Sequence, residues 1–203
     1  YAGAGGGFMD QLGYPYCRGR IFHTLEEDHG QYNDQKEVFW ASGACLFIRT
    51  NVFNNLGGFD SCFFAHMEEI DLCWRAKNKG LTVAYVGNST VYHVGGASLD
   101  VSNPKKTYLN FRNSLFALTK NAKGNLLFLI LVRLTLDGVA AAKFLLELKP
   151  KHTMAIIKAH FGFYKHLRHL LSKRNTTKYK KKYYNKTSIV VDYFINKKKL
   201  FNH

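Results

Sequence analysis

Cysteine is scarce in this sequence: four cysteines occur among 203 residues, and none of them forms a C-x-x-C pair. Cys45 and Cys73 lie in apolar runs, which is typical of small buried side chains. The spacing gives no disulfide framework, and a reducing cytosol fits the cysteine usage better than an oxidising compartment.

The chain also lacks an initiator methionine and a secretory h-region. Residues 1–7 are rich in glycine, but no strand precedes them and no G-K-[ST] pattern follows, so they are a poor match to a phosphate-binding loop. We read the chain as a fragment, or as a protein whose start is missing from this sequence.

Acidic residues nearly disappear from the second half of the chain. Residues 1–103 hold 7 Lys and Arg against 11 Asp and Glu, a net charge of −4, and residues 104–203 hold 22 against 3, a net charge of +19. Such asymmetry indicates an anionic partner, either a membrane surface or a nucleic acid. Tyrosines among the C-terminal lysines (Tyr179, Tyr183 and Tyr184) keep the second alternative open.

Hydrophobic periodicity predicts alternating strands and helices in the first part of the chain. The glycines Gly57 and Gly80 are expected to end two of the helices. The expected strands are residues 38–49, interrupted at Gly43, then 81–86 and 90–93; the expected helices are residues 51–56, 68–79 and 105–120.

Residues 126–148 form an apolar segment that is long enough, as a helix, to cross a bilayer. Charged residues interrupt it, and each charge at the bilayer centre costs roughly 2.5–3.5 kcal/mol. Arg133 and Asp137, four residues apart, can pair and soften that cost. We expect a helix that lies in the membrane interface or packs on the domain rather than one that spans the membrane.

Residues 151–173 have the pattern of a basic amphipathic helix, with apolar residues every three or four positions and lysines mostly off that stripe. Such a helix either lies on anionic lipid or packs on a neighbour with a solvated basic face. Residues 173–187 are expected to form a solvated, lysine-rich tail. Together these segments predict peripheral attachment to the cytoplasmic face of the plasma membrane.

Three carboxylates, Glu68, Glu69 and Asp71, fall within four residues at the expected start of the helix 68–79. A Gly-Gly-Phe-Asp turn and a Phe-Phe pair precede them, and His93 follows about two dozen positions later. Clustered carboxylates with a histidine can supply a general base and a metal ligand. The plainer alternative is a set of acidic residues that stabilise the helix dipole, with Asp71 and Arg75 as an ordinary ion pair.

The order and spacing of these motifs resemble the C-terminal half of the catalytic domain of family 2 glycosyltransferases, above all its rhamnosyltransferase-like members. The resemblance implies an α/β fold: residues 1–121 as the acceptor-side half of a GT-A domain, followed by membrane-associated helices in 122–174 and the lysine-rich tail 175–203. No D-x-D motif and no nucleotide-binding βαβ unit occur in the sequence. We expect the chain alone to be inactive.

The resemblance also implies catalytic roles. Glu69 stands at the position of the general base, where the family more often has Asp, and Glu68 and Asp71 are its catalytic neighbours. His93 would help to hold Mg²⁺ or Mn²⁺, the expected cofactor, together with ligands from the missing N-terminal half.

Further binding roles follow from the same resemblance. The expected diphosphate-binding residues are Gly95 and Gly96, where backbone can approach phosphate closely. The expected acceptor-binding residues are Trp40, Gly43 and Arg75, and for Trp40 a place in the core is nearly as good an interpretation.

The sequence thus predicts part of an inverting glycosyltransferase. It would move a sugar from a nucleotide-sugar donor to a glycan acceptor, expected to be lipid-linked, in the synthesis of cell-surface polysaccharide. An anionic membrane surface is a further expected partner, and a nucleic acid is not expected as a partner. The alternative is a non-enzymatic protein, either a basic nucleic-acid-binding protein or a membrane adaptor.

Overall fold

The computed structural model describes residues 5–92, 102–174 and 182–201. These residues divide into two compact units. The first unit contains residues 5–60, 69–92 and 182–201, and the second contains residues 61–68 and 102–174. The fold is mixed α/β, as expected. The units divide the chain differently from the expected ranges 1–121, 122–174 and 175–203, which stay a prediction about domain organisation.

Short antiparallel strands build the first unit. The strands β1 (Gly7–Met9), β2 (Pro15–Cys17), β3 (Arg20–Ile21) and β4 (Thr24–Leu25) form one antiparallel sheet in sequence order. A second sheet pairs β5 (Gln35–Val38) with β6 (Val83–Val86), with Gln35 opposite Val86. The strand expected over residues 81–86 is confirmed as β6.

The strand expected over residues 38–49 is wrong for most of its length, because β5 ends at Val38. Trp40 makes only an isolated bridge to Gly7. A turn follows, in which the Ser42 carbonyl accepts from the Cys45 N–H at 3.1 Å, and Phe47 beyond it is 93% exposed. The apolar run therefore lacks the burial that a central strand needs. Residues 90–92 of the third expected strand are also irregular.

Two helices of the expected lengths accompany these sheets. The helix α1 (Thr50–Asn55) ends in front of Gly57, which has φ +81° and donates its N–H to the Asn54 carbonyl. The helix α2 (Glu68–Asn78) ends in the same way at Gly80, whose N–H donates to the Lys77 carbonyl. Both sequence expectations are confirmed, because left-handed backbone at a helix end favours glycine.

Residues 182–201 pack into the first unit instead of forming a solvated tail. The Tyr183 hydroxyl donates to the Gln11 carbonyl at 2.6 Å, and its ring lies 4.8 Å from that of Trp74. Ile189 is fully buried in a core with Phe8 and other apolar residues, ahead of the short helix η2 (Val191–Ile195). Tyr183 thus serves the fold, and stacking on a nucleic-acid base would require it to leave Trp74.

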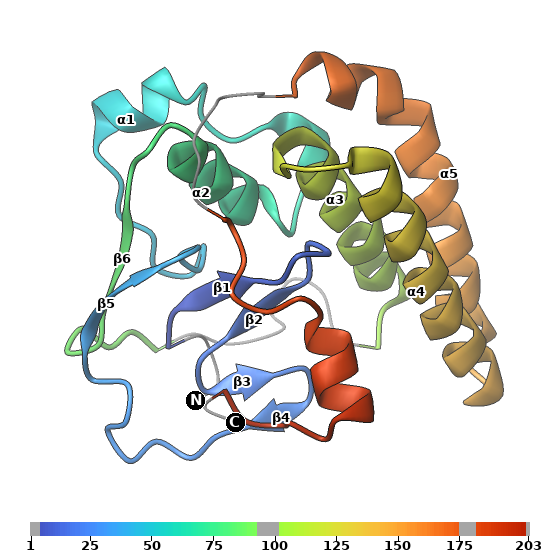
Figure 1. Ribbon diagram of the computed structural model, residues 1–203, viewed down its shortest axis with the longest axis horizontal. Helices are drawn as coiled ribbons and strands as arrows, with labels where there is room; N and C mark the ends of the chain where they lie inside the picture. The colour runs from blue at the N-terminus through green and yellow to red at the C-terminus, as the bar shows by residue number, and fades with distance from the viewer. Residues whose placement is uncertain (1–4, 93–101, 175–181, 202–203) are drawn as a thin grey trace. The chain divides into compact units, whose positions relative to one another are not determined.

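The second unit is helical. It contains the 3-10 turn η1 (Ser61–Phe63) and the helices α3 (Pro104–Asn121), α4 (Leu126–Leu146) and α5 (Pro150–Ser172). Asn103 and Asn125 cap α3 and α4 by accepting backbone N–H bonds at 2.9 and 3.1 Å. A short connection makes α4 and α5 an antiparallel pair (Figure 1).

A buried polar network joins α3 and α4. Arg133 donates from Nε to Asp137 Oδ1 at 2.8 Å and from Nη2 to Ser114 Oγ at 2.6 Å. Arg133 is 2% exposed and Asp137 is fully buried, so the pair expected from their spacing is confirmed inside the bundle. Within the described ranges, no helix combines the length and the apolar character needed to cross a membrane.

We predict that Asp137→Ala lowers the free energy of unfolding by about 3–5 kcal/mol, because Arg133 loses its charge partner while it stays buried. Replacing both charges with apolar residues, as Arg133→Met with Asp137→Leu, should restore most of that loss. Urea denaturation followed by helical circular dichroism measures both. The matched control is Glu147→Ala, which removes an exposed i, i+4 pair with Lys143 and should change little. Equal losses for Asp137→Ala and Glu147→Ala would contradict a buried network.

Candidate active site

The first turn of α2 carries the three predicted catalytic carboxylates. Glu68 and Glu69 are partly exposed, whereas Asp71 is fully buried. The unpaired N–H groups of a helix N-terminus stabilise negative charge nearby. Glu68 and Glu69 are therefore partly exposed residues in a favourable field, although Oε2 of each is buried.

Asp71 has a structural role in this arrangement. Its Oδ2 accepts from Arg75 Nε at 2.8 Å, and the same guanidinium donates to the carbonyls of Leu56 at 2.5 Å and Gly58 at 2.8 Å. The i, i+4 pair expected from the sequence is confirmed. Arg75 thus ties α2 to the glycine turn after α1. The geometry favours this structural use of Asp71 and Arg75, and their catalytic and acceptor-binding roles stay predictions.

Glu69 faces Gly43, another predicted site residue. A Cβ atom on Gly43 would lie 3.9 Å from the Glu69 side chain, which is ordinary van der Waals distance, so the two residues are close neighbours. Glu69 also acts on two thiols of the same unit. The pKa of Cys73 is raised to about 11 and that of Cys17 to about 12, chiefly by burial and with a contribution from the negative charge of Glu69. The carboxylate therefore lies close to β2 and to the inner side of α2.

Two buried polar atoms beside the carboxylates lack a hydrogen-bond partner among the described residues. They are Oε2 of Glu68 and Nε2 of His66. Burial and the charge of Lys106 lower the pKa of His66, and Glu68 raises it. Buried polar atoms without partners are uncommon in native proteins. Their position at the start of α2 is consistent with a site that a polar ligand completes.

The segment that leads into α2 has an unusual backbone. Phe64, His66 and Met67 have φ values of 64°, 67° and 75°, in the left-handed region that residues other than glycine rarely adopt. Such residues cost about 1–3 kcal/mol each and persist only where the surroundings hold them. The sequence patterns did not point to this segment or to Arg112 and Asn113 of α3, which bind it. A polar Asn113 four residues after the buried Leu109 was the available signal.

Trp40 lies in the core of the first unit. Its side chain is 8% exposed, and its indole N–H donates to the Phe8 carbonyl at 2.8 Å. This placement favours the core interpretation, and stacking on an acceptor sugar stays a prediction. The predicted metal ligand His93 and the predicted diphosphate-binding residues Gly95 and Gly96 lie outside the described residues.

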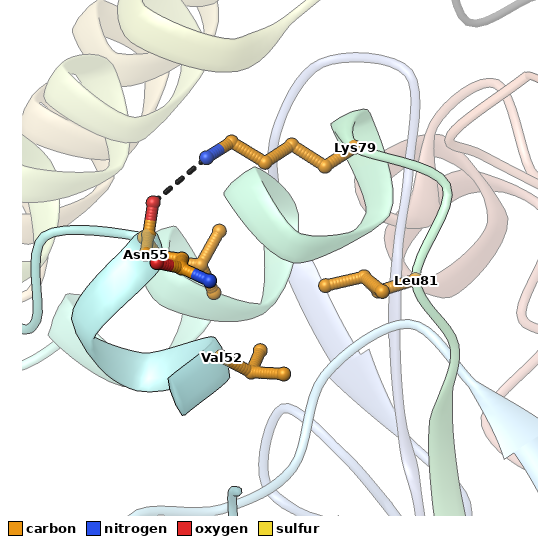
Figure 2. Close-up of a pocket in the computed structure, with 5 residues that line it drawn as sticks. Val52, Asn55, Lys79 and Leu81 are labelled. Atoms are coloured by element: carbon orange, nitrogen blue, oxygen red, sulfur yellow. Dashed lines mark hydrogen bonds between the residues drawn. The ribbon is translucent and has the colours of Figure 1, made fainter. Parts of the chain in front are cut away.

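A pocket between α1 and the connection from α2 to β6 does not include any predicted site residue. Figure 2 shows Val52, Asn55, Lys79 and Leu81 around it, with Leu56 as the fifth lining residue. Lys79 closes one side by donating from Nζ to the Asn55 carbonyl at 2.8 Å. None of the predicted catalytic carboxylates therefore lines this pocket.

Similarities to characterised proteins fall on enzymes of glycan assembly. An N-acetylglucosaminyl-diphospho-decaprenol L-rhamnosyltransferase of Mycobacterium tuberculosis is 39% identical over 59 residues, which is 29% of this chain and 19% of that protein. The low-salt glycan biosynthesis hexosyltransferase Agl10 of Haloferax volcanii is 29% identical over 109 residues, 51% of this chain and 35% of that protein. The rhamnosyltransferase WbbL of Escherichia coli is 37% identical over 49 residues, 24% of this chain and 19% of that protein.

These matches support a glycosyltransferase function at the family level. They are partial, because the chain spans only about a fifth to a third of the length of the curated relatives that it matches. No family model matches the chain, and no solved structure matches it.

Proposed function

We propose that this chain is the acceptor-side part of an inverting glycosyltransferase of the family 2 type, with a GT-A fold in the complete enzyme. The observation that carries the proposal is the first turn of α2, where partly exposed Glu69 lies beside Gly43, a predicted acceptor-binding residue. The similarity to rhamnosyl- and hexosyltransferases supports a nucleotide-sugar donor and a glycan acceptor, here a lipid-linked one.

Glu69 acts as the general base in this proposal. Inversion needs one base that takes the proton of the attacking acceptor hydroxyl as the sugar leaves its diphosphate. A helix N-terminus favours a negatively charged carboxylate, and Glu69 lies beside Gly43, where the resemblance implies acceptor binding. Glu68 lines the same turn, and Asp71 fixes α2 through Arg75.

A divalent cation, Mg²⁺ or Mn²⁺, is the proposed cofactor, and it would neutralise charge on the leaving diphosphate. The described part of the chain does not form such a site by itself, since no group of three or more His, Cys, Asp or Glu side chains gathers there. The metal proposal therefore rests on His93, Gly95 and Gly96 in the sequence, and no step of the proposed chemistry is derived from it.

We predict that Glu69→Gln lowers the turnover number of the complete enzyme by about 10²–10⁴-fold, because the amide keeps the shape of the side chain but cannot take a proton. The measurement is sugar transfer at saturating donor and acceptor. Glu68→Gln makes the same change one residue earlier and should lower the turnover number less than Glu69→Gln does, because Glu68 is a neighbour of the base and not the base itself. Near-normal transfer by Glu69→Gln would sink the assignment, and a loss confined to Glu68→Gln would move the base by one residue.

We further propose that the second unit binds peripherally to the cytoplasmic face of the plasma membrane through α4 and α5. Apart from Lys143, the exposed residues of α4 are nonpolar except for Thr135, whose hydroxyl donates to the Leu131 carbonyl at 3.0 Å. Their spacing places them on one side of the helix. They are Leu127, Phe128, Leu131, Thr135, Gly138, Val139, Ala142, Leu145 and Leu146.

The exposed side of α5 supplies the charge for an anionic surface. Met154, Phe161 and Tyr164 are more than half exposed there, beside Lys158 and Lys165. Apolar insertion together with about 1 kcal/mol for each lysine near an anionic bilayer favours attachment. A lipid-linked acceptor would then be presented in the plane of the membrane.

We predict that the complete protein sediments with vesicles that contain anionic lipid, and that added salt weakens the binding because exposed charges are screened. Leu131→Gln should weaken it about tenfold, since a half-exposed leucine loses its apolar insertion. The matched control is Leu25→Gln in β4, where the leucine is equally exposed. Binding to an oligonucleotide with indifference to lipid would favour the nucleic-acid alternative and overturn the membrane proposal.

A further inference from the structure

The residues just before α2 depend on α3 for their shape. Three of the five residues from Phe63 to Met67 have left-handed backbone, and none of these five is glycine. Such a conformation is not stable by itself, because each of these residues has a lower energy in extended or right-handed helical backbone. Contacts from elsewhere in the chain must stabilise it. Its contacts place it in the second unit with α3, although Glu69 and the rest of α2 belong to the first unit.

Asn113 binds this segment at three points. Its Nδ2 lies 2.8 Å from the carbonyl oxygens of Phe63, Ala65 and His66, and its side chain is fully buried. An amide nitrogen carries two hydrogens, so one of them is shared between two of these acceptors. One side chain therefore fixes the direction of three carbonyls in a stretch of four residues.

Arg112 sets the orientation of that amide and extends the contact. Its Nε donates to Asn113 Oδ1 at 2.9 Å, which leaves Nδ2 directed to the carbonyls. Its Nη2 donates to the carbonyls of Cys62 at 3.2 Å and Phe63 at 3.1 Å. Lys120 adds a cation–π contact, with Nζ 5.0 Å from the centre of the buried Phe63 ring.

We infer that Arg112 and Asn113 are positioning residues for the base. They hold residues 62–66 in the conformation from which α2 begins at Glu68. In this way they determine the position of the Glu69 side chain in the first turn of the helix. The inference rests on the proposed function, because it concerns the same base. Neither side chain is required to touch the substrate.

The substitution Asn113→Asp tests the inference with the smallest change in shape. It replaces the donor nitrogen with an oxygen, so that negative charge faces three carbonyl oxygens. Asn121→Asp is the matched control: Asn121 lies in the same helix, is 1% exposed and donates from Nδ2 to the Ala117 carbonyl within α3. Both variants are made in the complete enzyme, and thermal unfolding is recorded for each.

Two readouts separate positioning from general stability. Hydrogen exchange of the amides in residues 62–67 should become faster in Asn113→Asp and stay unchanged in Asn121→Asp. The turnover number should fall about 10- to 100-fold in Asn113→Asp with an unchanged KM for the donor, because misplacing a base affects the chemical step and not donor binding. Unchanged exchange at residues 62–67, or equal turnover numbers in the two variants, would overturn the inference.

Two further variants keep the outcomes distinct. If Asn113→Asp does not fold, Arg112→Lys replaces it, since lysine keeps the charge but loses the planar fork; it should show the same two changes, and their absence would overturn the inference. A fully active Asn113→Asp beside an inactive Glu69→Gln would reject the positioning role alone. A fully active Glu69→Gln would reject the proposed base and the positioning role with it.

Discussion

The backbone of the five residues before α2 is the constraint on which the site depends. A helix that begins at Glu68 presents two carboxylates at its first turn, and a start one residue later would rotate both by about 100° around the axis. Three left-handed residues in that approach cost free energy, and hydrogen bonds from a buried amide and a guanidinium offset the cost. The chain thus fixes the start of the helix through tertiary contacts.

Adjacent carboxylates receive different roles because their burial differs. Asp71 is fully buried and needs a partner, and Arg75 supplies one while binding two carbonyls near the glycine turn. Glu69 is partly exposed and lies beside Gly43. Sequence spacing alone does not separate these two acids, whereas their environments do.

Local rules predicted the helices well. Gly57 and Gly80 end α1 and α2 as expected, and the Arg133–Asp137 spacing gave a correct ion pair. Local rules failed where burial depends on distant parts of the chain. Residues 41–49 looked like a buried strand, but a turn at Ser42 and exposed Phe47 follow Trp40 instead. The lysines around Tyr183 suggested a solvated tail, but Tyr183 and Ile189 are anchored on residues more than 100 positions earlier.

The site was predictable only where its residues are close in the sequence. The carboxylates share one helical turn, so their cluster is visible in the sequence. Asn113 acts on a segment about 50 residues away, and its sequence neighbourhood gives only the weak signal of a polar residue in a buried helix. The proximity of Gly43 to Glu69 is also non-local: the resemblance assigned a role to each residue, but the spacing did not predict that they lie side by side.

The central claim is that Glu69 serves an inverting transfer of sugar from a nucleotide donor. Its most direct test is the anomeric configuration of the product made by the complete enzyme, read from the proton NMR signal of the transferred sugar. The account requires a configuration opposite to that in the donor, because a base-assisted acceptor attacks in one displacement. A product with retained configuration would contradict it.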